Sequence, residues 1–158
     1  GLKKFETVFG RKPNSFTPPA QQFPVDLENR LCEFGLLNYN KPFYRNRHLF
    51  DGQYKKEFNL LKKGGNNSPN IIVRNVVFEP CSGGDYHVSK ALNQIKAAFR
   101  WGKPANISSH RVNFCGHIDE SNRKLGIKKL KELLDAIIKT WPDVEFISAT
   151  QLGQLISA

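Results

Sequence analysis

The hydrophobic and polar positions in the second half of the chain change their period repeatedly. Residues 70–79 hold β-branched and aromatic side chains almost without a break, which is typical of a strand buried on both faces. Other stretches repeat apolar positions at roughly 3.6 residues, the period of an amphipathic helix. The pattern predicts strands at residues 70–79, 105–113 and 144–148 and helices at residues 85–101, 122–140 and 150–157. This order is typical of βαβ units and a parallel sheet.

The first half of the chain has a weaker pattern. Residues 25–34 carry apolar side chains at helical spacing and are followed by Gly35, a suitable helix end. Short strands are expected near residues 15–16 and 36–39. Residues 40–69 are polar and are expected to be irregular.

The composition fits one α/β domain over residues 1–158. Of the 158 residues, 39% are hydrophobic, which is enough for a sizeable core. No run approaches the roughly 18 apolar residues of a membrane span, so no membrane partner is expected. The three cysteines form no CxxC pattern, so neither a disulfide framework nor a zinc knuckle is supported.

The net charge of +10 admits two interpretations. A basic chain can bind nucleic acid or another acidic polymer. The lysines, however, are scattered in short groups and no known nucleic-acid motif is present. We therefore favour a solvated basic surface over a nucleic-acid partner.

Polar residues near the predicted strand ends are the candidate site. In parallel α/β sheets, functional groups gather at the C-terminal ends of the strands. The strand-end residues here are Pro18, Arg74, Asn75, Glu79, His110, Arg111 and Asn113. A shared position at one sheet edge would allow several of them to contact one substrate.

His110 is the candidate catalytic residue of this set. An imidazole with a pKa of about 6.5 can donate a proton to a leaving group near neutral pH, and a structural histidine is the alternative. Arg111 is suited to orient a carboxylate or sugar hydroxyl, or to form a structural ion pair. Arg74 lies in an apolar strand, where a charge needs a partner such as Glu79. Glu79 alone is weak support for glycoside hydrolysis, which normally needs two carboxylates.

Further polar and aromatic residues give weaker signals. His117 and Asp119 are two candidate metal ligands without a third. Five aromatic residues lie in or beside the irregular region, where they either stack on sugar rings or pack beneath a loop. They are Tyr39, Phe43, Tyr44, Phe50 and Tyr54.

Four segments resemble the polysaccharide deacetylase family, in particular a bacterial branch of it. They are residues 9–16, 73–80, 103–114 and 141–148, and the most specific are His110-Arg111-Val112-Asn113 and Trp141-Pro142-Asp143-Val144-Glu145-Phe146. The resemblance implies a deformed (β/α) barrel, of which this chain would be the C-terminal part. It implies removal of acetyl groups from a polysaccharide or other glycan in a bacterium, in a cytoplasmic or extracytoplasmic location.

The resemblance also implies a divalent metal, zinc being expected. The family's Asp-Asp and His-x-x-x-His ligand motifs do not occur in this sequence, so the metal ligands are expected outside it. His110 matches the family's catalytic acid, and Pro18 matches the wall of its substrate groove. Two alternatives remain open: a barrel-derived domain that only binds carbohydrate, and a basic nucleic-acid-binding domain. A partial barrel is also expected to expose sheet edges through which it forms a homodimer.

Overall fold

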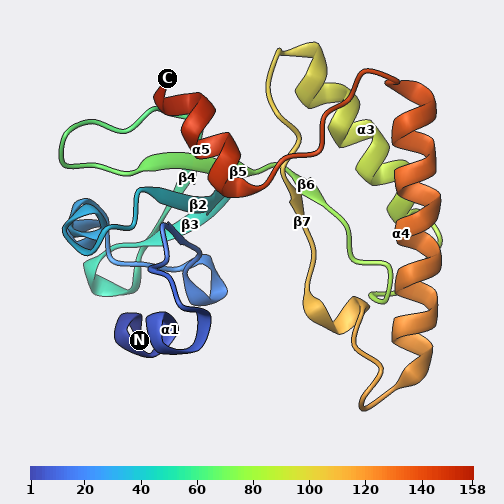
Figure 1. Cartoon of the computed structure of the whole chain (residues 1–158), viewed down its shortest axis with the longest axis horizontal. Coiled ribbons are helices and arrows are strands. Elements are labelled where there is room, and N and C mark those ends of the chain that lie inside the picture. Colours follow the sequence, from blue (N-terminus) through green and yellow to red (C-terminus); the bar gives the residue numbers. More distant parts are fainter. The chain divides into compact units, whose positions relative to one another are not determined.

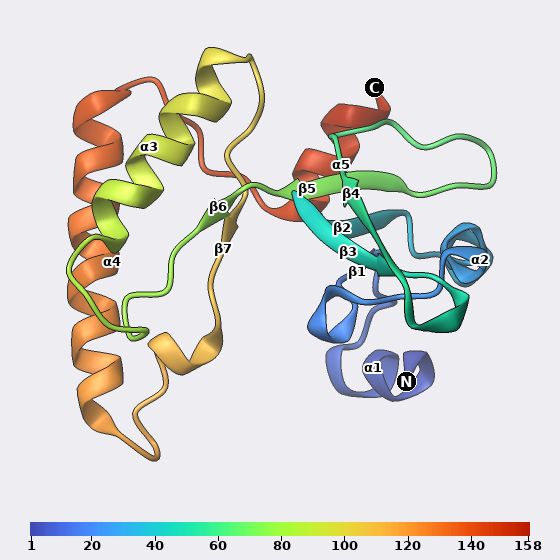
Figure 2. The same cartoon turned by 180° about the vertical axis from the view of Figure 1, so that it is seen from behind.

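A computed structural model describes the backbone of residues 1–158 and all side chains except those of Val25, Asn29, His48 and Phe50. The chain divides into two compact units (Figures 1 and 2). Unit 1 comprises Gly1–Val73 and Ile147–Ala158, and unit 2 comprises Arg74–Phe146. Both are mixtures of helices and short strands, and two of the strand pairs are parallel. The predicted α/β class is therefore confirmed at this level.

Unit 1 is built on a three-stranded sheet with the order β1-β2-β5, formed by β1 (Ser15–Phe16), β2 (Asn38–Pro42) and β5 (Asn70–Arg74). Strands β1 and β2 are parallel. The core beneath it centres on Tyr39, which is fully buried with Leu31 and Leu36. Burial of this ring rules out Tyr39 as a stacking surface for sugars.

The helices of unit 1 differ in part from the predictions. The helix α1 (Leu2–Phe9) was not predicted, and it buries none of its residues. Residues 25–34 form the short helix α2 (Val25–Glu28) and then the 3₁₀ helix η2 (Asn29–Phe34). Gly35 ends this segment at a φ of 76°. A short 3₁₀ helix η1 (Pro19–Gln21) follows Pro18. At the other end of the chain, α5 (Ala149–Ser157) begins with a capping box between Ser148 and Gln151.

The prediction that residues 40–69 are irregular is wrong. This region contains an antiparallel hairpin of β3 (Tyr44–His48) and β4 (Tyr54–Phe58), joined through η3 (Phe50–Gly52). Its polar composition is typical of a loop, which is why the hairpin was not predicted. The charged Arg45 is nevertheless buried, because it forms an ion pair with Glu57 across the hairpin.

Unit 2 packs the helices α3 (His87–Arg100) and α4 (Glu120–Thr140) against the short parallel pair β6 (Val76–Val77) and β7 (Ile107–Ser108). The apolar stripes predicted for both helices form its core. The buried core residues are Val76, Phe78, Ala91, Ile95, Leu133 and Ile137. The predicted helices at residues 85–101 and 122–140 are thus confirmed, with small changes at their ends.

The start of each helix differs from its predicted position. Asp85 does not cap α3; its carboxylate contacts Lys129 Nζ at 2.6 Å instead. The helix α4 starts after Asp119, whose side chain accepts a hydrogen bond from Ser121 N. Asn122, where the predicted helix began, lies inside the helix.

Two predicted strands are also corrected. Residues 70–79 form β5 and β6 with a break at Asn75, whose side chain bonds Pro104 O at 3.0 Å and Asn106 N at 2.8 Å. Residues 144–148 form no strand, although Val144 packs on the core of unit 2. A β-rich segment becomes a strand only when another strand pairs with it, and pairing is not encoded locally.

Candidate functional site

The ends of β6 and β7 bring two chain segments together. Their parallel register pairs Val76 with Ile107 and Val77 with Ser108, and the Phe78 N–H continues the ladder to Ser108 O at 2.9 Å. Glu79 and His110 follow at corresponding positions on the two strands. Their proximity therefore follows from the register of the sheet, as the strand-end rule predicts.

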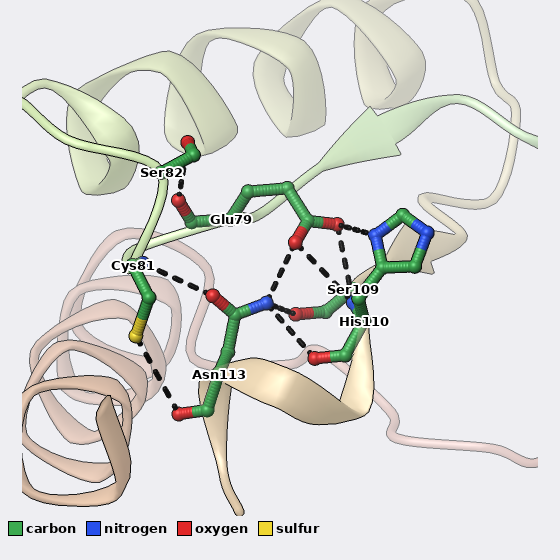
Figure 3. A network of polar contacts seen from close by, with 6 residues as sticks. All are labelled: Glu79, Cys81, Ser82, Ser109, His110 and Asn113. Atoms are coloured by element: carbon green, nitrogen blue, oxygen red, sulfur yellow. Dashed lines mark hydrogen bonds and ion pairs between the residues drawn. The ribbon is translucent and has the colours of Figure 1, made fainter. Parts of the chain in front are cut away.

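A carboxylate contacts the histidine ring directly (Figure 3). Glu79 Oε1 lies 2.8 Å from His110 Nδ1 and 3.1 Å from the His110 backbone N. The Glu79 side chain is 19% exposed and that of His110 is 73% exposed. Because Nδ1 faces the carboxylate, Nδ1 is assigned as the donor, and Nε2 is the ring nitrogen available to a bound molecule.

Asn113 holds this carboxylate from the protein side. Its side chain is 1% exposed, and Nδ2 lies 2.6 Å from Glu79 Oε2, 3.1 Å from Ser109 Oγ and 2.9 Å from His110 O. Its Oδ1 accepts a hydrogen bond from Cys81 N at 3.0 Å. Both polar atoms of Asn113 are thus engaged inside the protein (Figure 3). The structure places Asn113 where it positions Glu79, and its predicted contact with substrate remains a prediction.

The chain turns sharply after His110. The predicted strand over residues 105–113 ends at Ser108, and Arg111–Asn113 form the 3₁₀ helix η4. The turn is closed by Asn113 N bonding His110 O and by Phe114 N bonding Arg111 O. This turn carries the Asn113 side chain back toward the sheet end, which an extended strand would not do.

Helix α4 packs directly on the backbone of this turn. A Cβ added at Gly126 would lie 1.6 Å from Asn113 O and 2.7 Å from Asn113 C. Only a glycine permits this approach, because the obstacle is backbone rather than a movable side chain. Gly126 was not singled out from the sequence, since a glycine inside a helix carries no sign of what lies above it.

Cys81 is a second residue that the sequence did not mark as part of the network. Its Sγ lies 3.3 Å from Asn122 O and 3.9 Å from Asn113 O. Burial raises the pKa of the Cys81 thiol, and the nearby carboxylates of Asp119 and Glu79 raise it further. The thiol is therefore protonated near neutral pH and is not a nucleophile there.

The remaining predicted site residues have different surroundings. Arg111 is exposed beside His110. Both ends of the Asn75 amide form the two hydrogen bonds to backbone atoms described above. Arg74 ends β5, and the described partners of Glu79 are His110 and Asn113, not Arg74. Pro18 is buried and belongs to unit 1.

No group of three or more metal-binding side chains occurs among the residues that the structure describes. In the predicted pair of His117 and Asp119, Oδ1 of Asp119 accepts hydrogen bonds from the backbone N and the hydroxyl of Ser121. These bonds lower the pKa of Asp119. The side chains present thus do not fit the zinc ion that the resemblance implies.

Within the described part of the chain, no helix is both long enough and apolar enough to cross a membrane. Comparisons with protein-family models, curated proteins and solved structures find no match. The chemistry of the site is therefore argued from the contacts shown in Figure 3.

Proposed function

We propose that this chain contributes a general acid to a polysaccharide deacetylase-like hydrolase, and that His110 is that acid. One observation carries the proposal: Glu79 orients an exposed imidazole at the ends of two parallel strands. The proposal includes the finer fold, in which β6 and β7 are neighbouring strands of a partial (β/α) barrel. The resemblance of residues 103–114 to the deacetylase family supports the choice of reaction.

The contacts define what each side chain would do. Glu79 accepts a hydrogen bond from His110 Nδ1–H and stabilises the ring when Nε2 is also protonated. Hydrolysis of an acetamide adds water to the carbonyl carbon and breaks the carbon–nitrogen bond. The departing nitrogen takes the proton from His110 Nε2, and the proton that the attacking water loses restores the protonated ring. The products are the free amine and acetic acid, which ionises to acetate and one proton.

Two further residues support this arrangement. Asn113 fixes the second oxygen of Glu79 at 2.6 Å, so the carboxylate has little freedom to rotate away from the ring. Arg111 is exposed next to His110 and is suited to bind a sugar hydroxyl or carboxylate. The implied zinc ion has no ligand set among the described side chains, so no step of the proposal passes through it.

The test is acetate release from acetylated glycans by the protein that carries this chain. His110→Ala should lower the rate by about a hundredfold or more, because a positioned general acid typically accelerates a reaction by about that factor. Glu79→Gln should also lower it, because the neutral amide stabilises the imidazolium less. His117→Ala is the matched control, since His117 is an exposed histidine of the same unit. An unchanged rate in His110→Ala removes His110 from the mechanism.

A domain that binds carbohydrate without chemistry is the second candidate, and one observation favours it. Unit 1 exposes several aromatic side chains on its hairpin, namely Phe43, Tyr44, Tyr54 and Phe58. A purely binding role predicts glycan binding that His110→Ala does not change, together with no acetate release from any acetylated glycan. Acetate release that depends on His110 would exclude it.

A further inference from the structure

The β3–β4 hairpin has two chemically different faces. Its register pairs Tyr44 with Phe58, Asn46 with Lys56, and Arg45 with Glu57. Because side chains alternate along a strand, the first two pairs lie on one face and the third lies on the other. We call the face of Tyr44, Asn46, Lys56 and Phe58 the aromatic face.

The opposite face of the hairpin packs against the rest of unit 1 through buried ion pairs. Arg45 has a side chain only 3% exposed, and it contacts Glu57 Oε2 at 2.5 Å and Glu28 Oε1 at 3.0 Å. Lys41 contacts the other oxygen of Glu28 at 2.5 Å. Two cations therefore meet two carboxylates, and the buried charges of this face balance. Such a cluster fixes the hairpin to its unit, and its charges are already paired with one another.

The aromatic face, by contrast, is open. The rings of Tyr44 and Phe58 lie 5.3 Å apart, and those of Phe43 and Phe58 lie 5.9 Å apart. Phe58 is 65% exposed, Phe43 49% and Tyr44 40%. The Tyr44 hydroxyl donates to Asn46 Oδ1 at 2.7 Å, which orients both groups at the edge of the rings. Three touching aromatic rings in solvent form an apolar surface of the kind that marks a binding site.

A pocket of about 530 Å³ shares Phe58 with this face. Its lining includes Lys41, Lys62, Lys63 and Glu28, together with apolar side chains such as Leu60 and Ile71. Glu28 is already paired with Lys41 and Arg45. Lys62 and Lys63 are exposed and supply the excess charge, so the pocket favours an anionic group.

We propose that the aromatic face and this pocket bind a glycan whose sugar rings carry carboxylate groups. The apolar face of a sugar ring can lie on Phe58 and Tyr44, while its hydroxyls hydrogen-bond the Asn46 amide. The carboxylate meets the pocket lysines, Lys62 and Lys63. The site lies in unit 1 and its argument uses neither Glu79 nor His110, so it does not rest on the proposed reaction.

The distribution of charge favours a glycan over a nucleic acid. A nucleic acid carries a phosphate at every nucleotide, and its affinity depends on several cations along the same surface. The hairpin places Lys56 on the aromatic face, but Arg45, Arg47 and Lys55 alternate onto the opposite face. The aromatic face itself thus carries one ammonium, and the two pocket lysines, Lys62 and Lys63, lie together at one end of the site, which suits sugars with an occasional charge.

Titration calorimetry with the chain tests this proposal. The probes are an oligogalacturonate, its methyl ester, and a single-stranded oligothymidylate of similar length. The oligogalacturonate should bind more tightly than its ester, since the two share a ring and differ in charge. Tyr44→Ala and Phe58→Ala should each weaken binding at least tenfold, and Lys62→Ala with Lys63→Ala should remove the preference for the acid over the ester.

The controls separate a binding role from loss of structure. Trp101→Ala removes an aromatic side chain of unit 2 that is 78% exposed, and it should bind as the parent does. Phe58→Tyr keeps an aromatic ring and should restore most of the affinity lost in Phe58→Ala, which a merely unfolded variant would not explain. Binding is measured without any acetate release, so failure of the proposed reaction leaves this result intact.

Three outcomes would overturn the proposal. They are absence of binding to both glycans, equal affinity for the acid and its ester, and tighter binding of the oligothymidylate than of either glycan. Affinities that do not change in Tyr44→Ala and Phe58→Ala would likewise place any glycan site elsewhere in the chain.

Discussion

Gly126→Ala should destabilise the protein even though alanine is the better helix former. On helix propensity alone, the change in α4 would stabilise by about 1 kcal/mol. The added Cβ, however, would lie 1.6 Å from Asn113 O, where an ordinary contact is 3.4–4 Å. The turn and the helix must therefore separate by more than 1 Å, roughly estimated from these contact distances.

The cost of that separation decides the sign. Inserting one extra carbon into a packed core typically costs about 1–3 kcal/mol, and the upper end applies here because the obstacle is backbone. After the propensity gain is subtracted, we expect the free energy of unfolding to fall by about 1–2 kcal/mol. The shift would also move Asn113 away from Glu79, so the acetate release that we propose should fall as well.

Urea denaturation of the parent and of Gly126→Ala measures the first effect. Lys131→Ala is the matched control, since Lys131 is an exposed residue of the same helix and its loss should change stability by no more than about 0.5 kcal/mol. Amide chemical shifts of Asn113 and His110 report the second effect. A Gly126→Ala variant as stable as the parent would show that α4 does not press on the turn as described.

Two further predictions concern buried polar groups. Asn113→Ala should lower the free energy of unfolding by about 2–4 kcal/mol in urea denaturation, because it leaves Cys81 N without its partner and removes the shorter of the two hydrogen bonds to Glu79 Oε2; exposed Asn93→Ala should change it little. Burial, followed by the charge of Glu28, raises the pKa of Tyr39 to about 12. The unfolded chain releases this proton near pH 10, so stability should fall as the pH rises from about 10 to 12. Ultraviolet titration against Tyr39→Phe would detect the late-ionising tyrosine, and its absence would contradict the burial argument.

The amphipathic helices were predictable because their signal is local. The residues that form the core of unit 2 recur at helical spacing within α3 and α4, so no knowledge of distant segments was needed. The ends of the helices were less predictable, since Asp85 finds Lys129 on another helix rather than capping its own. A capping residue and an ion-pairing residue look alike in a sequence.

The strands were predictable only in part because pairing is non-local. Asn75 interrupts residues 70–79 because its amide bonds Pro104 and Asn106, about thirty residues away. The hairpin of β3 and β4 was missed because Arg45 looks like a loop residue until Glu28 and Glu57 are found beside it. Residues 144–148 have strand propensity without a strand to pair with.

The strand-end rule predicted where the candidate site lies, but not which of its residues is exposed and which is buried. From the sequence, His110 and Asn113 were equally polar residues near one strand end. In the structure, the Asn113 side chain is almost fully buried and both of its polar atoms form hydrogen bonds. The His110 side chain is exposed and leaves a ring nitrogen open to solvent. The exposed one is available for chemistry, and the buried one fixes its geometry.

This distinction depends on the turn after Ser108 and on the contact of Gly126 with that turn. If the strand had continued through residue 113, alternation would have carried Asn113 along the sheet and away from Glu79. Instead η4 folds it back, and the missing side chain at Gly126 lets α4 hold the turn in place. The orientation of Glu79, and through it that of His110, is therefore set by a backbone contact that neither residue makes. Perturbing Gly126 tests the proposed acid without altering a single atom of it.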